Sequence, residues 1–179
     1  MSTIAKSFAE HAVVPDVVPV APTALLKVTY PSGVEVEEGN ELTPTQVKDE
    51  PAVSWDAEQD AVYTVAMTGP DVRNSEWQHW LVGNVPGSDV SKGDVLSAYV
   101  GAGPKPSTGL HRYVFLVYQQ SDEIKFDEER LTNNSNDGRG NFSIAKFAEK
   151  YDLGNPVAGN FYKAQYDDYV PLLYKQLGI

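Results

Sequence analysis

A run of six apolar or aromatic residues, Tyr113 to Tyr118, is the feature that most constrains the fold of this chain. A strand with one solvated face alternates apolar and polar residues, whereas a run that is apolar at every position suits a strand covered on both faces. We therefore predict a central strand over residues 113–118. The sheet that contains it is expected to be part of a sandwich.

Shorter strand signals precede this run. Leu26, Val28 and Tyr30 alternate with polar residues, as in a half-buried strand, and the segment Pro31 to Gly33 predicts the turn that follows. Further candidate strands are residues 53–55, 63–67, 80–82 and 95–100. Glycine and proline residues separate these candidates, which is typical of a sheet-based sandwich.

Helical spacing is found at both ends of the chain. A first helix is predicted from Thr3 to about Val14. Two later helices carry apolar residues at helical spacing: Ile144, Phe147, Ala148 and Tyr151 after a Ser143 cap, then Val170, Leu173, Tyr174 and Leu177. Asp167 or Asp168 is expected to begin the last helix, with Pro171 in its first turn. The pattern predicts one mainly β domain, residues 1–179, with a large central antiparallel sheet and peripheral helices.

The formal net charge is −11, from 14 Lys and Arg residues against 25 Asp and Glu residues. A field of this sign repels nucleic-acid backbones and disfavours adhesion to anionic lipid surfaces. A single small anion could still be held, because dipoles and hydrogen-bond donors act at short range. We therefore expect no nucleic-acid partner.

The chain contains no cysteine, which excludes disulfides, thiolate zinc sites and a cysteine nucleophile. Its first eleven residues lack the apolar core of a signal peptide, and no apolar run approaches the ~20 residues that span a bilayer. We expect a cytoplasmic protein without integral membrane association.

Two of the three histidines begin apolar strands. His11 falls in the first predicted helix, where a solvated role is expected. His79 precedes an apolar strand, and His111 precedes the central run. A histidine at a strand start is more often a hydrogen-bonded structural residue than a ligand, so on these residues alone both interpretations stay open.

The loop before His111 favours a binding role. It reads Gly101-Ala-Gly-Pro-Lys-Pro-Ser-Thr-Gly109. Glycines permit positive φ angles and close backbone approach, prolines stiffen the turn, and free N–H groups in such a loop form an anion nest. With the Tyr113 hydroxyl and imidazole donors beside it, the loop could hold a phosphate. The alternative is a rigid connection between two strands.

Many short sequence segments of this chain match those of a known protein family, in the same order. They are Leu42-Thr-Pro-Thr-Gln-Val47, Ser54-Trp-Asp56, Gly69-Pro-Asp71, Glu76-Trp-Gln-His-Trp-Leu-Val82, Gly101 to Tyr113, Asn134-Ser135, Arg139-Gly-Asn-Phe142, Lys150-Tyr151, Pro156-Val-Ala-Gly159 and Asp167-Asp-Tyr-Val-Pro171. From about Leu25 to its end, the chain resembles the phosphatidylethanolamine-binding proteins, which include the Raf kinase inhibitor proteins. The resemblance implies a large central antiparallel sheet packed with a smaller sheet, and C-terminal helices.

The resemblance also implies a pocket for phosphate-like anions or for the phosphatidylethanolamine head group. Carried over by motif, its residues are His79, Gly101, Gly103, Pro104, His111 and Tyr113, with Pro70 and Asp71 from the acidic loop and Tyr174 and Leu177 at the mouth. Gln78 stands where the family has the first histidine of a His-His pair. We expect no cofactor, no metal and no catalytic residue.

The sequence differs from the family pattern at two places in this pocket. Gly69 replaces the first Asp of the acidic loop, and the stretch Val72 to Ser75 is several residues shorter than usual. The missing carboxylate removes a hydrogen-bond acceptor and a charge that would raise the pKa of the neighbouring imidazole. We expect anion binding to persist and ethanolamine selectivity to weaken, while Asp71 could orient Arg112 or a loop amide. Lys105, between two prolines, either attracts anions or is solvated.

The expected function is that of a monomeric, non-catalytic binding protein for a phosphate-containing small molecule or a phospholipid head group. The resemblance implies regulation of a protein kinase or a serine protease, which the residues themselves do not specify. Two alternatives remain, a protein-interaction module with a vestigial pocket and a hydrolase. The chain has no G-x-S-x-G, H-E-x-x-H or Walker motif, which disfavours an enzyme.

Overall fold

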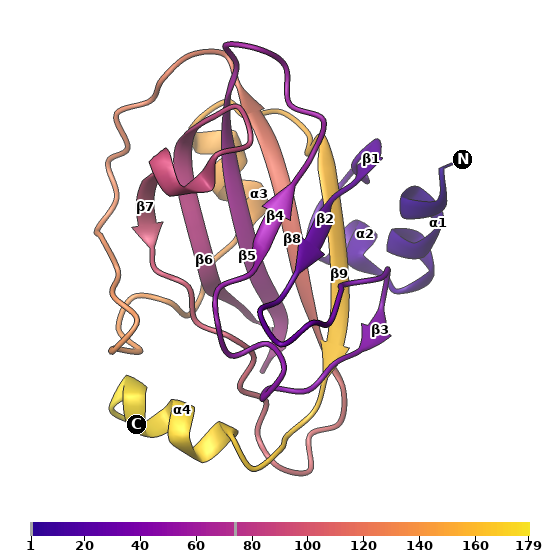
Figure 1. The fold of residues 1–179 in the computed structure, drawn as a ribbon, viewed down its shortest axis with the longest axis vertical. Coiled ribbons are helices and arrows are strands. Elements are labelled where there is room, and N and C mark those ends of the chain that lie inside the picture. Colours follow the sequence, from indigo (N-terminus) through magenta and orange to yellow (C-terminus); the bar gives the residue numbers. More distant parts are fainter. Residues whose placement is uncertain (1, 74) are drawn as a thin grey trace.

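The computed structural model describes residues 2–73 and 75–179, which form a seven-stranded sheet and a two-stranded sheet (Figure 1). The large sheet has the order β1-β9-β8-β5-β6-β7, with β3 also paired to β9. Its strands are β1 (Ala24–Leu25), β3 (Asn40–Glu41), β5 (Val62–Val72), β6 (Ser75–Pro86), β7 (Asp94–Ser97), β8 (His111–Gln120) and β9 (Ala158–Ala164). The small sheet pairs β2 (Lys27–Thr29) with β4 (Ala52–Ser54). Met1 of the N-terminal segment and Asn74 of the shortened stretch lie outside the described residues.

The long strands of the large sheet pair antiparallel, as predicted. These pairs are β5 with β6, β5 with β8, and β8 with β9. The two-residue strands β1 and β3 run parallel to β9 instead, because each enters the sheet from a long connection rather than from a hairpin. The mainly β class, with one large and one small sheet, is confirmed.

Strand β8 is covered on both faces, as the uninterrupted apolar run predicted. Tyr113, Phe115 and Val117 point to the face that the small sheet covers, which we call the front face. The alternate residues of β8 point to the back face, which α1 (Thr3–Glu10), α2 (Val13–Asp16) and α3 (Ile144–Lys150) cover. The two faces thus carry two separate cores.

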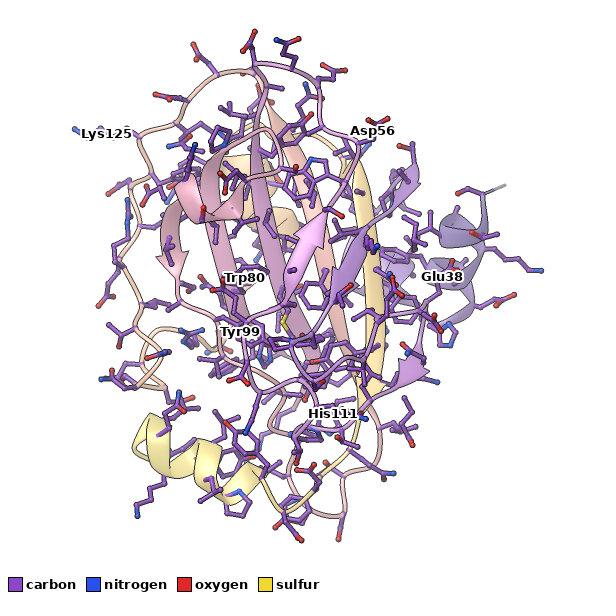
Figure 2. All side chains as sticks on the ribbon, in the orientation of Figure 1. Glu38, Asp56, Trp80, Tyr99, His111 and Lys125 are labelled. Atoms are coloured by element: carbon purple, nitrogen blue, oxygen red, sulfur yellow. The ribbon has the colours of Figure 1, made fainter. Side chains whose placement is uncertain are left out.

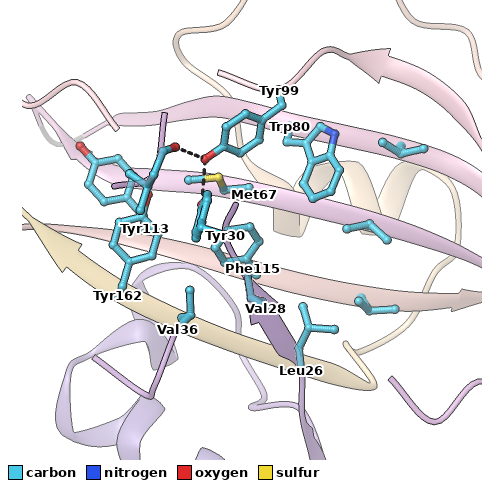
Figure 3. Packing of buried hydrophobic residues seen from close by; sticks show 14 of the residues in the cluster. Leu26, Val28, Tyr30, Val36, Met67, Trp80, Tyr99, Tyr113, Phe115 and Tyr162 are labelled. Atoms are coloured by element: carbon cyan, nitrogen blue, oxygen red, sulfur yellow. Dashed lines mark hydrogen bonds between the residues drawn. The ribbon is translucent and has the colours of Figure 1, made fainter. Parts of the chain in front are cut away.

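The front core contains a group of tyrosines (Figure 3). The Tyr99 hydroxyl donates to the Val47 carbonyl at 2.7 Å and accepts from the Tyr30 hydroxyl at 2.8 Å. The Tyr113 and Tyr162 rings stack with centroids 5.2 Å apart. Among the described residues, the buried Tyr162 hydroxyl has no hydrogen-bond partner.

This contrast predicts unequal effects from removing single hydroxyls. We expect Tyr99→Phe to destabilise the protein by about 1–3 kcal/mol, because it leaves the Val47 carbonyl and the Tyr30 hydroxyl unpaired. Tyr162→Phe serves as the control and should change stability by less than about 0.5 kcal/mol. Urea unfolding of both variants measures the difference, and equal losses would contradict the hydrogen-bond assignment.

The N-terminal segment differs from the predicted single helix. Helix α1 ends at Glu10, and α2 begins at Val13 after Ala12, whose φ is 55°. This left-handed residue redirects the chain so that Val13 is buried in the back core. His11 is correspondingly half-buried against the Phe161 ring, at 5.0 Å between centroids, rather than solvated.

Two further elements complete the fold. Helix α4 (Val170–Leu177) has Pro171 in its first turn, as predicted, but it begins after Tyr169 rather than at Asp167 or Asp168. It lies beyond one end of the large sheet (Figure 1). A short 3-10 helix, Val90–Lys92, precedes β7. No helix within the described residues is long and apolar enough to cross a membrane.

Candidate functional site

His79 is the buried centre of the candidate site. It lies on β6 with only 4% of its surface exposed, and its Nδ1 atom is 2.8 Å from the Val100 carbonyl oxygen. A carbonyl can only accept, so Nδ1 carries the hydrogen and Nε2 is the acceptor nitrogen. The ring lies edge-on to Trp77 and Tyr113, with centroids 4.6 and 5.2 Å away.

The imidazole of His79 is neutral at pH 7. Burial and, to a lesser degree, the Arg139 cation lower its pKa to about 4, against the opposing effect of the Val100 and Gly101 backbone. Position 69 lies directly beside this ring. A Cβ atom on Gly69 would stand 3.0 Å from Nε2 of His79 and 3.5 Å from the Tyr113 ring. The imidazole therefore has no acidic neighbour at the position where the family carries one.

The pKa of His79 predicts a pH-dependent stability. An unfolded histidine binds its proton near pH 6.5, and the folded His79 only near pH 4, so the unfolded state holds the extra proton between these values. Stability should therefore rise with pH through this window and be lost on acidification, by up to roughly 3 kcal/mol.

Urea unfolding of wild type and His79→Gln between pH 4 and 7.5 measures this contribution. The variant should lose less stability than wild type as the pH falls. Parallel curves for wild type and His79→Gln would contradict the assignment.

The glycine loop lies against His79 and Tyr113. Gly101 and Ala102 are buried, and within the described residues their N–H groups donate to no acceptor. Gly103 is half-buried, and its N–H faces the Tyr113 hydroxyl, a contact that lowers the pKa of Tyr113 against the larger effect of burial. Buried N–H groups are rarely left unpaired in proteins, so those of Gly101 and Ala102 are available to a ligand or to solvent. Pro104 is buried beside them.

Close packing, rather than positive φ, explains the glycines at 101 and 103, because neither residue has a positive φ. A Cβ on Gly101 would stand 2.5 Å from the Val47 carbonyl oxygen. A Cβ on Gly103 would stand 2.9 Å from Leu173. In this loop only Gly109, with φ of 77°, is a positive-φ glycine.

Helix α4 packs against the outer side of this loop. The Tyr174 hydroxyl donates to the Gly103 carbonyl at 2.6 Å. Leu177 is buried with Leu173 and Val100 in a small cluster that also contacts Trp77. Tyr174 thus touches the loop directly, whereas Leu177 holds the helix in place.

His111 and Tyr113 share one side of β8, with Arg112 on the other. His111 lies at the end of the sheet nearest to α4 (Figure 2), and its Nε2 atom is 2.8 Å from the Thr108 hydroxyl. Burial lowers the pKa of His111, against the opposing effect of Asp71. Burial raises the pKa of Tyr113, which is 3% exposed, so its hydroxyl stays protonated.

Asp71 is bound to Arg112. Its carboxylate accepts from the Arg112 backbone N–H at 2.8 Å, from Nε at 3.0 Å and from Nη2 at 2.7 Å. Burial acts to raise the pKa of Asp71, but the contacts with Arg112 outweigh it and lower the pKa. Arg112 also donates to the His11 carbonyl and to Asp16, both at 3.0 Å. Asp71 therefore orients Arg112, one of the two roles considered for it.

Pro70 and Asp71 line a cavity of about 760 Å³ on the back face, together with Glu76, Lys146 and Lys150 among others. His79, Gly101, Gly103, His111 and Tyr113 do not line it. The charged side chains that line this cavity are largely paired with one another, as Arg112 is with Asp71. The residues predicted for one pocket are thus divided between two faces of the sheet.

Arg139 is a supporting residue whose role the sequence analysis missed. Its side chain is fully buried, and Nη1 donates to the carbonyls of Gln78 and His79, at 2.9 and 3.2 Å. Nη2 donates to the carbonyls of Ala98 and Thr132, at 2.7 and 2.9 Å. An arginine between two glycines, Gly138 and Gly140, in a loop without a neighbouring basic residue was the available signal.

No three His, Asp or Glu side chains of residues 2–73 and 75–179 lie together in a way that could hold a metal ion. The site instead combines backbone donors, one imidazole acceptor and aromatic walls. Such a set suits a small molecule held by hydrogen bonds.

Fold and geometry together define a β protein with a candidate ligand site at one end of its large sheet. The family model of the phosphatidylethanolamine-binding proteins matches residues 32–163, and the chain belongs to this family. The sequence-based recognition is thereby confirmed.

Three relatives illustrate the range of the family. The chain is 43% identical over 174 residues to a Drosophila melanogaster protein named "Putative odorant-binding protein A5", covering 94% of this chain and 83% of that protein. The solution structure of CG7054 is 43% identical, with a TM-score of 0.73 and coverage of 92% and 97%. A carboxypeptidase Y inhibitor, solved in complex with its cognate proteinase, is 25% identical, with a TM-score of 0.76 and coverage of 90% and 94%.

Proposed function

We propose that this protein binds a small phosphate-containing ligand, without catalysis, at the site formed by His79, Tyr113 and the Gly101–Gly103 loop. The observation that carries the proposal is the pair of buried, consecutive N–H groups of Gly101 and Ala102, which among the described residues have no acceptor. Free backbone N–H groups of this kind can donate to the oxygens of a small anion. Membership of the phosphatidylethanolamine-binding family supports the same ligand class.

An amide NMR titration with inorganic phosphate and methyl phosphate tests the proposal. The largest saturable shifts should fall on Gly101, Ala102 and Gly103. His79→Ala should weaken binding at least tenfold, while His11→Ala should bind as wild type does. Absence of a saturable shift, or shifts confined to the back-face cavity, would contradict the proposal.

Thermal unfolding provides an independent measurement. A ligand at 100 times its Kd stabilises the folded state by about 2.7 kcal/mol, which for a chain of this size raises Tm by roughly 5–10 °C. Phosphorylethanolamine should raise Tm no more than methyl phosphate does at equal saturation. A clear preference for the ethanolamine compound would contradict the expected loss of selectivity beside Gly69.

Control of a protein partner is the second candidate function. The similarity to a carboxypeptidase Y inhibitor solved with its proteinase favours it. Inhibition of carboxypeptidase Y by this protein, measured with and without phosphate, tests this second function directly. Undiminished peptidase activity at a molar excess of the protein would count against it and leave small-ligand binding as the function.

The proposal includes a non-enzymatic role in the cytoplasm. The relative named as an odorant-binding protein and the inhibitor structure both support a binding role. Esterase and phosphatase assays on wild type and His79→Ala test the first part, and turnover lost in the variant would overturn it. Cell fractionation tests the second part.

A further inference from the structure

The back-face cavity is separate from the proposed phosphate site. Its volume of about 760 Å³ lies within the roughly 300–1,000 Å³ of small-molecule sites. Its walls come from β5, β6 and β8, from α3 and the loop before it, and from Asp16 and Glu128. None of the residues that line it belongs to the proposed phosphate site, so the two sites can be tested separately.

Most of the charged side chains that line this cavity are paired. Arg112 bonds to Asp71 at 2.7 Å and to Asp16 at 3.0 Å. Lys150 bonds to Glu128 at 2.5 Å. The lining contains four acidic and three basic side chains, so these pairs leave one acid and one base without an ionic partner among the described residues.

Glu76 is the acid without a cation. Its Oε2 atom accepts from the Thr68 hydroxyl at 2.8 Å and from the Ile144 N–H at 3.0 Å. Its Oε1 atom accepts from no donor within residues 2–73 and 75–179. Burial raises the pKa of Glu76 against the opposing effect of the two hydrogen bonds, which means that water solvates the carboxylate poorly. A cation bound at Oε1 would compensate for this lost solvation.

Lys146 is the base without an acid, and its surroundings differ from those of Glu76. Lys146 is exposed, so water solvates its ammonium group and an anion bound there would gain little. The acidic side chains of the lining outnumber the basic ones by one, and the whole chain carries a net charge of −11. The electrostatic field therefore favours a cationic ligand in this cavity.

Phe142 supplies an aromatic wall next to Glu76. The two residues pair across an antiparallel bridge, in which the Phe142 N–H donates to the Glu76 carbonyl at 3.0 Å. Side chains of directly opposed residues lie on the same face, and both of these line the cavity. The Phe147 ring extends the wall, at 6.2 Å between centroids. Asn141 and Ser143 add neutral side-chain oxygens to the lining. Such a set suits an ammonium group attached to an apolar body.

We infer that the back-face cavity binds a small primary amine with an apolar body, whose ammonium group donates to Oε1 of Glu76 while the apolar body lies against Phe142. This inference goes beyond the proposed function, because it involves neither phosphate nor a protein partner. It uses none of the residues of the phosphate site, so either proposal can fail while the other stands.

An amide NMR titration at pH 7.5 with 2-phenylethylamine, 2-phenylethanol and 3-phenylpropanoate tests the inference, because the three compounds share an apolar body and differ in charge. The amine should cause saturable shifts at Glu76, Phe142 and Ile144. It should bind roughly tenfold more tightly than the alcohol, since hydrogen bonds between charged groups are the stronger ones. Equal affinities for amine and alcohol, a preference for the carboxylate, or no saturable shift with the amine would overturn the inference.

Glu76→Gln is the matched variant, because the glutamine amide oxygen can still accept from Thr68 and Ile144 while the charge is removed. This variant should bind 2-phenylethylamine roughly tenfold more weakly than wild type and should bind 2-phenylethanol as wild type does. A purely structural role of Glu76 would affect the two compounds equally. An unchanged amine affinity in the folded variant would contradict the inference.

Asp16→Asn is the control for general charge attraction, because it removes the same charge from the lining but from a carboxylate that Arg112 already holds. Its amine affinity should stay within about threefold of wild type. Lys146→Gln should bind the amine at least as tightly as wild type. Equal losses in Glu76→Gln and Asp16→Asn, or weaker amine binding in Lys146→Gln, would overturn the inference. If Glu76→Gln does not fold, Lys146→Gln and the three compounds with wild type still decide.

Discussion

Replacing Arg139 by methionine should destabilise the protein by about 4 kcal/mol. The substitution removes a charged donor from four carbonyls, two of them buried and two partly buried, although the His79 carbonyl still accepts from the Val100 N–H. Hydrogen bonds to a charged group contribute about 1.5–3 kcal/mol each. Removal of a buried cation offsets part of this loss. Burial lowers the pKa of Arg139 to about 10, which corresponds to roughly 3 kcal/mol. The hydrogen bonds outweigh that gain, so the net effect is a large loss.

Arg130→Met is the matched control in the same long loop. Arg130 pairs with Asp94 at 2.9 Å, but both side chains are substantially exposed, so this variant should lose less than about 1 kcal/mol. Arg139→Lys should fall between the two, because lysine keeps the charge but has three donors on one nitrogen. Urea unfolding at pH 7 measures all three. A loss for Arg139→Met no larger than that of Arg130→Met would show that the carbonyls find other donors.

Gly101→Ala should destabilise the protein by about 2–4 kcal/mol and abolish phosphate binding. The added Cβ would stand 2.5 Å from the Val47 carbonyl oxygen, and this carbonyl is fixed because it accepts from the Tyr99 hydroxyl. The loop itself must therefore move, which costs the energy typical of overpacking and displaces the N–H groups of residues 101–103.

Gly140→Ala is the control, because the added Cβ would have no heavy atom within 4 Å and Gly140 has no positive φ. Calorimetry should find Tm lowered by roughly 5–15 °C for Gly101→Ala and nearly unchanged for Gly140→Ala. The phosphate titration should show the same order. A Gly101→Ala protein with wild-type Tm and affinity would mean that the loop accommodates a side chain.

Local patterns were sufficient to predict the strands and helices that bury a continuous or periodic apolar face. The run of β8 and the spacing of α3 and α4 are of this kind. Strand β9 was missed, because Gly159 and Asn160 weaken its strand signal. Besides the adjacent Phe161 N–H, the partners of the Asn160 side chain are distant groups, the carbonyls of Leu26 and Val36 and the N–H of Glu38. Such partners exist only after folding, so no local pattern reveals them.

The residues of the candidate site stay a prediction from family resemblance, and the hydrogen bonding and protonation of these residues could not be predicted from the sequence. Sequence could place His79 beside the loop but could not specify that Val100 would hold the Nδ1 hydrogen. It assigned Pro70 and Asp71 to the same pocket, whereas both line the back-face cavity. The sheet separates them, and the face of a strand residue beyond a β-bulge depends on register, which the bulges in β5 and β6 alter.

The Asp71 carboxylate has a consequence for the way the sheet ends. Paired residues of β5 and β8 stop at Thr68 and Val114, and the next free N–H on this side of β8, that of Arg112, bonds to the Asp71 carboxylate. The last hydrogen bond between these strands is therefore accepted by an ionisable carboxylate, whereas the preceding ones join backbone amide and carbonyl groups. The contribution of this hydrogen bond to stability is present at neutral pH and is lost as the pH falls through the lowered pKa of Asp71. In strong acid, β5 and β8 should begin to separate at the end of the sheet that carries His111 and the ligand loop.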